Sequence, residues 1–561
     1  MNKKYFVIFI GQVALLLTAA AGASDSEDSA LPAILQQKTI TATTFLPDFS
    51  FAGYGNGIVD LPQATGTVVR VDDFGAVAND GKDDTRAVLD AIAHANTVTG
   101  PVVVRFGAGR YRLTGVVRIE RSHIVLQGSG SGEAGTTLYF PRPLNQVDKS
   151  SSLDELRQYI VQLDKRQVEP HLNLDEFFSE YSWSGGFIWV QKPGTRAASY
   201  LEEYDPEIQK VVDVVSAARG SQAVSVSDGG KLNVGDVVQV QWINRDGPEA
   251  GIIKSLYGDS YKMAGSHHWS FPERPLVRQT TRVLAISGND VTLADPLLHD
   301  VSAAVPAQIA EWDHLEQVGI EDIHFEFPVS PYFGHHMERG YNGIYLTSAF
   351  DSWVRDVRIT NADSGILTYN SANVTLRNIT SDGERNAHYA VHMGNVHNVL
   401  ADNVTILNPV LHSLTFNTQS TRCVYRDAQV FNTPTLDQHA GANHQNLYDN
   451  VTLHVTARAS SAGPVIPVFD GSGAGYWQPG HGGYSTTWNL RLLVTGGAYP
   501  DEVITIQGLD EGPMARIVGL HGNREFRLDY RPAPYVEKLN VELSATPSLY
   551  DYQLAQRRGA E

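Results

Sequence analysis

The stretch GIYLTSAFDSWVRD, at residues 343–356, begins a series of five segments that align over fourteen residues without a gap. Successive segments start 22, 25, 24 and 23 residues apart, and each ends in Asp or Asn followed by an apolar residue. A repeat of this length that is built from short strands and turns predicts a solenoid, and a right-handed parallel β-helix fits it best. The other segments are 365–378, 390–403, 414–427 and 437–450.

The last residue of each segment forms a column of Asp and Asn. Both residue types tolerate left-handed backbone conformations and bond to neighbouring main chain, so we expect the column to occupy one turn, stacked from coil to coil. An apolar, a polar and a second apolar residue usually follow, as in Val357, Arg358 and Ile359, which is the period of a half-buried strand. The column consists of Asp356, Asn378, Asn403, Asp427 and Asn450.

The alignment also predicts which side chains share an outer face. Ile344, Ile366 and Val391 fill one column and are expected to point into the core, so the columns beside it must point outward. A merely solvated face would favour Lys, Glu, Ser and Thr, whereas this one is rich in aromatic, acidic and imidazole groups. We interpret it as a functional groove; scattered surface histidines, or an alignment wrong by one residue, are the alternatives. The outward residues are Tyr341, Tyr345, Asp363, His388, His392, His412, Phe416, Asp437 and His439.

Residues 1–23 are predicted to be a secretory signal peptide, with Lys3 and Lys4 before an apolar run and a small-residue cleavage site at 21–23. We therefore expect a secreted or periplasmic protein without membrane insertion after signal removal; an uncleaved anchor is the alternative. The chain has 43 basic and 62 acidic residues, a net charge of −19, which argues against nucleic acid as a partner. Its one cysteine, Cys423, excludes an intramolecular disulfide and a thiolate zinc cage.

Changes of pattern divide the rest of this all-β chain into five parts. An apolar stripe at helical spacing from Ala87 to Ala95, preceded by Asp83 and Asp84, predicts a helix that covers the open end of the solenoid. The parts are an irregular N-terminal segment (24–66), the first β-helix coils with an excursion (67–200), an inserted small β unit with a long aromatic loop (201–310), the main coils that carry the site (311–535) and a C-terminal tail (536–561).

Three stretches near the N-terminus carry a family resemblance. DFGAVANDGKDDTRAVLDAI (73–92), GAGRYRLTG (107–115) and IVLQGSG (124–130) resemble the N-terminal coils of the pectate-lyase-like β-helix superfamily, of the pectate lyase 3 and rhamnogalacturonase/epimerase-like type. The resemblance covers residues 71–130 and implies the right-handed parallel β-helix. It implies less about activity, because the superfamily contains lyases, hydrolases, epimerases and phage depolymerases.

The predicted face suits a polysaccharide, because sugar rings pack on aromatic side chains and a solenoid offers a long groove. The first hypothesis is a lyase that cleaves a uronic-acid-containing polysaccharide by β-elimination, which needs a base, an acid and a group that neutralises the carboxylate. No Lys occurs between residues 263 and 537, which excludes a lysine base on this face. The candidate bases are His388 and His412, and the candidate acids are Tyr341, Tyr345 and His439.

Asp437 and His439 resemble the Asp-x-His element of β-helix alginate epimerases, which also remove the C5 proton. The likeness covers three residues and lacks the proline and the second acid of the epimerase pattern, so epimerisation itself is not implied. Because the chain is acidic, arginine or bound calcium would have to supply local positive charge. The expected substrate-binding residues are Tyr345, Asp363, Arg385, His392, Phe416, Arg339 and, in the aromatic loop, Trp269.

Two other functions stay open. An inverting glycoside hydrolase of the same fold needs two carboxylates about 6.5–9.5 Å apart. Asp363 and Asp437 are expected three coils, or about 14 Å, apart, so Asp437 would need a different partner. The second alternative is a non-catalytic carbohydrate-binding solenoid. No cofactor is firmly indicated; calcium on loop carboxylates and zinc on His388, His412 and Asp363 are the candidates.

Overall fold

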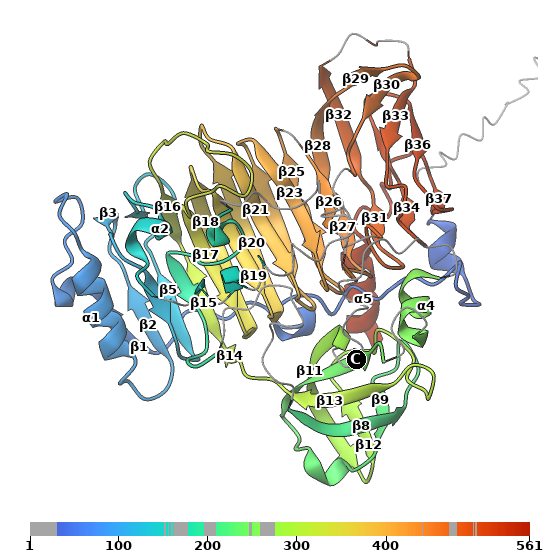
Figure 1. Cartoon of the computed structure of the whole chain (residues 1–561), viewed down its shortest axis with the longest axis horizontal. Coiled ribbons are helices and arrows are strands. Elements are labelled where there is room, and N and C mark those ends of the chain that lie inside the picture. The colour runs from blue at the N-terminus through green and yellow to red at the C-terminus, as the bar shows by residue number, and fades with distance from the viewer. Residues whose placement is uncertain are drawn as a thin grey trace, which may run out of the picture.

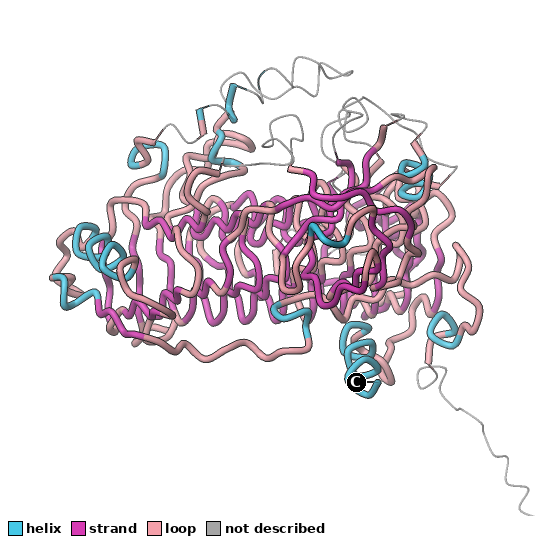
Figure 2. Tube along the Cα trace, turned by 90° about the horizontal axis from the view of Figure 1, so that it is seen from below, coloured by secondary structure: helices cyan, strands magenta, loops and turns pink. Residues whose placement is uncertain are grey.

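The computed structural model describes residues 31–150, 153–154, 156–158, 161, 178–195, 209–245, 250–258, 275–432, 434–439, 441–469, 479–496, 499 and 502–560. They form the all-β, right-handed parallel β-helix that the repeats and the family resemblance predict (Figure 1). Figure 2 shows the coils from below, with their strands stacked in rows. The predicted signal peptide, residues 1–23, and Trp269 lie outside the described residues.

One parallel sheet, called here the site sheet, carries most of the predicted site residues. Its strands follow one another along the solenoid in chain order. They are β4 (Val117–Ile119), β7 (Ile188–Val190), β17 (Asn342–Thr347), β19 (Ser364–Tyr369), β21 (Ala387–Gly394), β23 (Val410–Asn417) and β26 (Leu436–His439).

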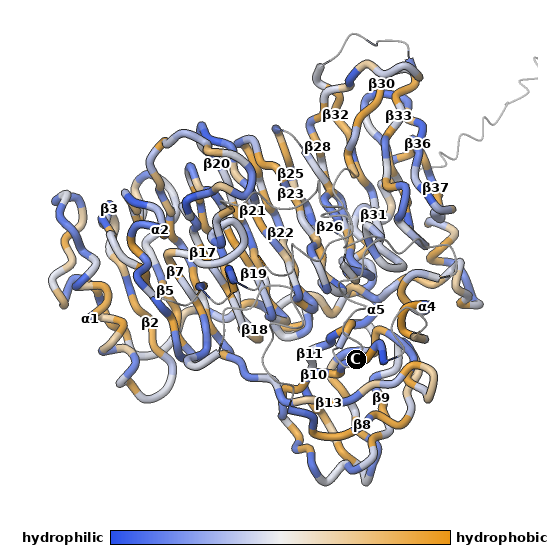
Figure 3. Tube along the Cα trace, viewed as in Figure 1, coloured by the Kyte–Doolittle hydropathy of each residue, from blue (hydrophilic) through white to orange (hydrophobic). Residues whose placement is uncertain are grey.

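A second, twenty-stranded parallel assembly forms the other sides of the coils. Figure 3 shows hydrophobic and hydrophilic residues mixed along the coils. It contains β1 (Thr67–Arg70), β2 (Val102–Arg105), β3 (Gly109–Arg112), β5 (Ile124–Gln127), β6 (Thr136–Tyr139), β14 (Leu315–Glu316), β15 (Val318–Glu321), β16 (Ile323–Glu326), β18 (Ala349–Thr360), β20 (Ala372–Asp382), β22 (Leu400–Ile406), β24 (Val424–Arg426), β25 (Gln429–Val430), β27 (Leu447–Asp449), β28 (Thr452–Thr456), β31 (Thr486–Trp488), β32 (Arg491–Gly496), β34 (Arg516–Val518), β35 (His521–Gly522) and β37 (Tyr535–Glu537).

The predicted turn column of Asp and Asn is confirmed. All five residues have positive φ angles, between 52° and 56°. Their side chains bond from coil to coil: Asn378 Nδ2 donates to Asp356 Oδ1 at 2.7 Å, and Asn403 Nδ2 donates to Asn378 Oδ1 at 2.8 Å. Asn450 donates to Asp427 in the same way at 2.6 Å. The ladder repeats the same bend in every one of these coils.

The register of the site sheet departs from the predicted alignment at β23. The first three segments pair as predicted, but Val391 then pairs with Leu414 rather than with Thr415. We compare the stretch of chain that connects the site-sheet strand of each coil with the next strand of the same coil. This stretch is one residue longer in the fourth coil than in the first three, and two residues longer in the fifth. The coils therefore differ in turn length, which an alignment without gaps does not register.

Phe416 shows the consequence of this shift. A slip of one residue reverses the direction of a side chain in a strand. The ring of Phe416, expected on the outer face, is fully buried in the core, with its centroid 5.1 Å from that of Tyr425 and 4.6 Å from that of Tyr448. Phe416 is therefore a core residue, and the prediction that it binds substrate is wrong.

The helix α1 (Thr85–Ala95) covers the first coils, as predicted, and buries its apolar stripe from Ala87 to Ala95. Asp83 Oδ1 accepts from the main-chain N–H of Thr85 at 3.1 Å. Asp84 instead bonds away from the helix, because its carboxylate accepts from Val77 N and Arg112 N at 2.9 and 3.0 Å. The N-cap residue Asp84 therefore makes no side-chain bond to the helix, and Asp83, just before it, accepts from the first helical N–H group.

Residues 210–311 contain a closed six-stranded barrel that lies beside the later coils (Figure 1). Within the part described, α4 (Gly251–Tyr257) follows β10, and the barrel has its own apolar core. The barrel strands are β8 (Lys210–Ser216), β9 (Ala223–Val226), β10 (Val237–Ile243), β11 (Pro275–Ser287), β12 (Asp290–Leu293) and β13 (Ala307–Glu311). A separate sheet near the end of the solenoid has β29 (Arg458–Ser460), β30 (Gly463–Ile466), β33 (Ile504–Gln507) and β36 (Phe526–Asp529).

Where the barrel meets the coils there is a buried polar layer, called here the seam. His397 Nε2 donates to Asp295 Oδ2 at 2.8 Å, and Arg422 Nη1 lies 3.9 Å from the same oxygen. His299 and His444 face each other, with their Nε2 atoms 2.8 Å apart. All five side chains are at most 2% exposed. Burial lowers the pKa of His444 to about 3.

The N-terminal segment runs along the outside of the coils as a strap, residues 31–64. At one end Ile34 N donates to Glu537 in the last strand of the solenoid at 3.2 Å, and farther on Gly53 N donates to Asn398 O at 2.8 Å. The final helix α5 (Leu549–Ala560) holds this strap, since Tyr550 donates to Ala52 O at 3.0 Å. The short helix α2 (Leu144–Val147) lies near the first coils. Among the described residues, none of the helices has the length and apolar character that a membrane crossing requires.

Candidate active site

The loop between β16 and β17 lies over the site sheet and carries His335, His336 and Glu338. The main-chain oxygen of His336 accepts from Ser179 N at 2.7 Å, and Glu338 Oε2 accepts from the hydroxyl of Ser182 at 2.6 Å. Both bonds join the loop to residues 179–182, a distant part of the chain. The loop is thereby fixed against the coils.

A buried ion pair holds the end of this loop. Arg385 Nη2 lies 2.8 Å from Asp363 Oδ1, and both side chains are only 4% exposed. Asp363 Oδ2 also accepts from the main-chain N–H groups of Gly340 and Tyr341 at 3.0 and 2.8 Å, while Arg385 donates to Asn361 O at 3.0 Å. Asp363 and Arg385 therefore position the loop, and the expectation that they bind substrate directly is wrong.

Three other predicted residues are also covered. Tyr345 is fully buried, and its ring centroid lies 5.3 Å from that of Trp189 and 5.9 Å from that of Tyr369. His392 is fully buried beside Tyr369, and burial lowers its pKa to about 3. Tyr341, a candidate acid, is 7% exposed. The structure therefore gives Tyr345 and His392 no open face for a sugar.

Five imidazoles meet where the loop crosses β21, β23 and β26. His335 Nε2 lies 3.2 Å from His388 Nε2 and 3.5 Å from His412 Nε2. The ring centroid of His336 is 3.7 Å from that of His335, and that of His439 is 5.1 Å from that of His412. His388 is fully buried, whereas His335 is exposed, so the cluster reaches from the interior to the surface.

Asp437 lies between two of these rings. His412 Nδ1 is 3.1 Å and His439 Nδ1 is 3.3 Å from Asp437 Oδ2. The hydroxyl of Thr415 donates to the same oxygen at 2.8 Å. The carboxylate is fully buried, but the two imidazoles are 13% and 21% exposed. One buried carboxylate thus orients two accessible imidazoles.

The charge states follow from these surroundings. Burial raises the pKa of Asp437, but the neighbouring His412 and His439 outweigh it, and the pKa falls well below its usual range. Loss of hydration among the surrounding protein atoms, together with the neighbouring His412, lowers the pKa of His335 to about 4, although part of the residue is exposed. Burial and the neighbouring imidazoles lower the pKa of His336 to about 2. Near neutral pH the cluster therefore holds an ionised Asp437 carboxylate and neutral imidazoles of His335 and His336, which can accept a proton or a metal ion.

The structure brings four predicted catalytic residues together: His388, His412, His439 and Asp437. Arg339 is exposed and stacks over Phe333, 3.9 Å from its ring centroid. The roles of His335, His336, Glu338 and Thr415 were not predicted from the sequence. The adjacent histidines just before Tyr341 were the available signal for the loop, whereas the register shift hid the pairing of Thr415 with Asp437.

Two groups of three side chains within the described residues bring possible metal ligands within 4.8 Å of one another. One consists of His335, His336 and His388, and the other of His412, Asp437 and His439. The predicted zinc ligand Asp363 belongs to neither, because Arg385 and two main-chain N–H groups occupy it. Both groups are rich in imidazole nitrogen, which suits zinc and related ions better than calcium.

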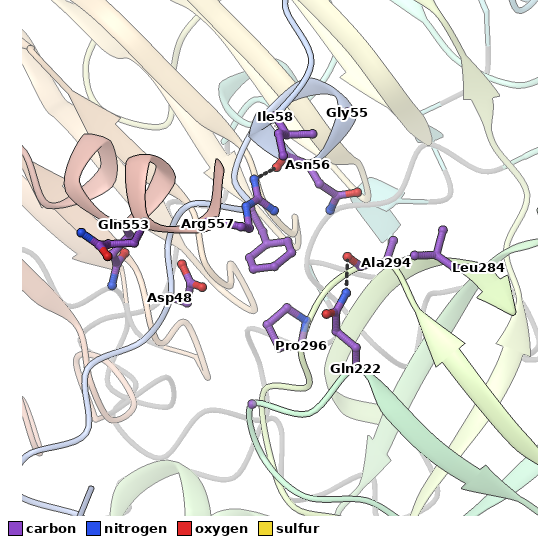
Figure 4. Close-up of a pocket in the computed structure, with 13 residues that line it drawn as sticks. Asp48, Gly55, Asn56, Ile58, Gln222, Leu284, Ala294, Pro296, Gln553 and Arg557 are labelled. Atoms are coloured by element: carbon purple, nitrogen blue, oxygen red, sulfur yellow. Dashed lines mark hydrogen bonds between the residues drawn. The ribbon is translucent and has the colours of Figure 1, made fainter. Parts of the chain in front are cut away.

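An open cleft of about 720 Å³ lies elsewhere, between the strap, α5 and the barrel (Figure 4). Its lining is Asp48, Phe51, Gly55, Asn56, Ile58, Gly220, Gln222, Leu284, Ala294, Pro296, Gln553, Gln556 and Arg557. Arg557 donates to main-chain oxygens of Ser50 and Asn56, and Gln222 donates to Ala294 O. Arg557 thus joins α5 to the strap, and Gln222 bonds within the barrel region. The lining of this cleft contains no histidine.

Residues 68–140 match a family model described as rhamnogalacturonase A/epimerase, pectate lyase-like. The first coils are pectate-lyase-like. This match overlaps residues 71–130, on which the resemblance rests, and confirms it. No curated protein matches the chain.

Several solved structures of low identity are similar to the chain over most of its length. The tailspike gp61 of Pseudomonas phage phi297 is 13% identical, over 83% of this chain and 78% of its own, with a TM-score of 0.42. The tailspike gp49 of Pseudomonas phage LKA1 is 14% identical, over 84% and 80%, with a TM-score of 0.41. The A-module of the Azotobacter vinelandii mannuronan C-5 epimerase AlgE4 is 10% identical, over 84% and 96%, with a TM-score of 0.31. These likenesses assign no chemistry to the chain.

Proposed function

We propose that the protein is a secreted polysaccharide-degrading enzyme, a lyase that cleaves a uronic-acid-containing polysaccharide by β-elimination. The observation that carries the proposal is the pair of accessible imidazoles, His412 and His439, on either side of the buried Asp437 carboxylate. The match of the first coils to a rhamnogalacturonase and epimerase model supports a polysaccharide as substrate.

His412 is the proposed base and His439 the proposed acid. Asp437 holds the Nδ1 edge of each ring, which leaves each Nε2 for proton transfer. His412 takes the proton from C5 of the uronate, the electron pair forms the C4–C5 double bond, and the C4–O bond breaks. His439, which acts as the imidazolium with a proton on each ring nitrogen, gives its Nε2 proton to the departing oxygen and becomes neutral. Asp437 stabilises the imidazolium that forms on His412, as a positioning carboxylate does in other histidine-based sites.

The other candidate base and acids are less suited, because His388 and Tyr345 are fully buried and Tyr341 nearly so. The hydrolase alternative is also less supported. It needs a carboxylic acid that is free to donate a proton, whereas Asp437 is flanked by imidazoles, Glu338 accepts from two hydroxyls and Asp363 is paired with Arg385. Imidazole chemistry therefore fits the described residues better than a carboxylate pair.

The test is to incubate the protein with a panel of uronate polymers and neutral glycans, and to follow both the ultraviolet absorbance of unsaturated uronate and the number of new reducing ends. Elimination produces both signals together. New reducing ends without unsaturated product would replace the lyase by a hydrolase, and binding without either signal would favour the carbohydrate-binding solenoid.

A substrate with a better leaving group distinguishes the proposed base, His412, from the proposed acid, His439. A uronate that carries an aryloxy group on C4 needs little protonation of its leaving oxygen, so it should restore most of the rate to His439→Ala and none to His412→Ala. Equal rescue of both variants would contradict this assignment.

A further inference from the structure

We propose that the loop and the site sheet together bind a divalent transition-metal ion of the zinc class, through the imidazoles of His335, His336 and His388. Two of the ligands come from the loop between β16 and β17, and the third comes from β21. The site therefore depends on the contact between loop and sheet, and the sequence separates its ligands by about fifty residues.

The spacing of the nitrogens fits coordination. Zinc–nitrogen bonds of about 2.0–2.1 Å at the tetrahedral angle place two ligand atoms about 3.3–3.4 Å apart. His335 Nε2 and His388 Nε2 are 3.2 Å apart, close to this edge length. His336 completes a set of three ligand atoms that all lie within 4.8 Å of one another. Three protein ligands and an open position are the usual arrangement of a catalytic zinc site.

The residues that contact the proposed ligands also support a metal site. Histidines that bind metals usually turn their second ring nitrogen toward a carboxylate or a carbonyl oxygen. His388 Nδ1 faces Glu338 Oε1 at 3.6 Å, and Glu338 is itself held by hydroxyl groups of Ser182 and Tyr332 at 2.6 and 3.2 Å. The buried ion pair of Asp363 and Arg385 fixes the end of the loop that carries the other two ligands.

The open side of this set adjoins the proposed proton-transfer residues, since His412 Nε2 lies 3.5 Å from His335 Nε2. The role of the ion rests on the proposed function: it would face the uronate carboxylate and stabilise the negative charge that develops when C5 loses its proton. The chain is acidic, and Arg385 is engaged in the buried ion pair, so such an ion would supply the positive charge that the reaction needs.

The experiment uses the whole mature protein after treatment with a chelator. It is titrated with Zn²⁺ by calorimetry and with Co²⁺ by visible spectroscopy, whose bands report tetrahedral nitrogen ligation. We expect one ion per chain. His335→Ala and His336→Ala, both on the loop, should abolish this binding, and Glu338→Gln should weaken it about 10–100-fold. His94→Ala, which removes an exposed histidine from α1, is the matched control and should bind as the wild type does.

Circular dichroism and thermal melting of each variant show that lost binding is not lost folding. The proposal is overturned if the wild type binds neither ion, or if His335→Ala and His336→Ala bind both ions unchanged. The experiments can contradict the metal site and the lyase activity independently of each other. Metal binding without any elimination product removes the lyase and leaves the site, whereas elimination by protein that binds neither ion removes the site and leaves the lyase.

Discussion

Two histidine groups within the described residues, in the candidate active site and in the seam, have similar members and opposite surroundings. In the seam, His299, His397 and His444 are at most 2% exposed, and each ring is bonded to a neighbour. In the candidate site, His412 and His439 are partly exposed and share one carboxylate. Clustering of imidazoles is therefore not in itself a sign of function. Accessibility of the ring edge opposite the carboxylate separates a reactive group from a structural one.

The largest expected effect is on activity, in the candidate site. His412→Ala should lower kcat/KM for elimination about 10²–10⁴-fold, the usual contribution of a general base. The ring is only 13% exposed and pairs with the fully buried Asp437, so the variant should also lose some stability, and its activity is compared per folded molecule. Initial rates of unsaturated uronate formation measure the first effect, with His94→Ala as control. A variant with full activity would remove His412 from the mechanism.

In the seam the large effect should be on stability instead. Asp295→Asn removes the charge that faces His397 and the buried Arg422, and breaking such a pair costs about 3–5 kcal/mol. Urea unfolding measures this loss. Asp90→Asn, which breaks the exposed pair with Arg86, should cost less than about 1 kcal/mol.

Activity per folded molecule of Asp295→Asn should equal that of the wild type. If elimination falls with stability intact, the seam takes part in function and the contrast between the two groups is wrong.

Acid should destabilise the protein through the buried imidazoles. Burial lowers the folded-state pKa of His444 to about 3, whereas an unfolded histidine titrates near 6.5. Below about pH 6.5 the unfolded chain binds the proton and the folded chain does not, so stability is full above that pH and falls as pH approaches 3. The slope is about 1.4 kcal/mol per pH unit for each such group.

Urea midpoints measured between pH 7 and 4 check this sign. His444→Gln, which cannot be protonated in this range, should have a shallower slope than the wild type. Equal slopes would mean that other groups account for the acid sensitivity.

Two threonines give the smallest and most closely matched contrast. Thr415 donates to Asp437 at 2.8 Å, and Thr421 lies 2.7 Å from His397 Nδ1. Each Thr→Val change should cost about 1–3 kcal/mol, because a buried polar group loses its partner. Only Thr415→Val should also shift the pH profile of kcat/KM, since Asp437 orients the proposed base. A shifted profile in Thr421→Val would erase the distinction.

The sequence predicted the fold better than the site. The Asp and Asn column could be predicted because left-handed turns select these residues in every coil, whatever lies elsewhere in the chain. Phe416 could not be placed correctly, because its direction depends on the length of a turn in its own coil. The roles of Asp363 and Arg385 could not be predicted either, since only the folded loop shows that they bond to each other.

The positions of His335 and His336 could not be predicted from the sequence either. Their residue types suit proton transfer or metal binding, but their nearness to His388 depends on a loop that folds back across the sheet. Contacts to Ser179 and Ser182, far away in the sequence, fix that loop. A repeat pattern predicts how the coils stack. It does not predict which part of the coils is covered by a loop that leaves the repeat.

The strap also has a consequence for the order of events during synthesis. A stack of coils is stabilised mainly by contacts between neighbours, so it can assemble progressively as the chain emerges. The strap emerges near the beginning, yet Ile34 bonds to Glu537, more than five hundred residues later. Its docking groove is incomplete until almost the whole polypeptide is available. The strap is therefore made before the coils and is among the last segments to be seated, and it joins the ends of a stack of coils into one cooperative unit.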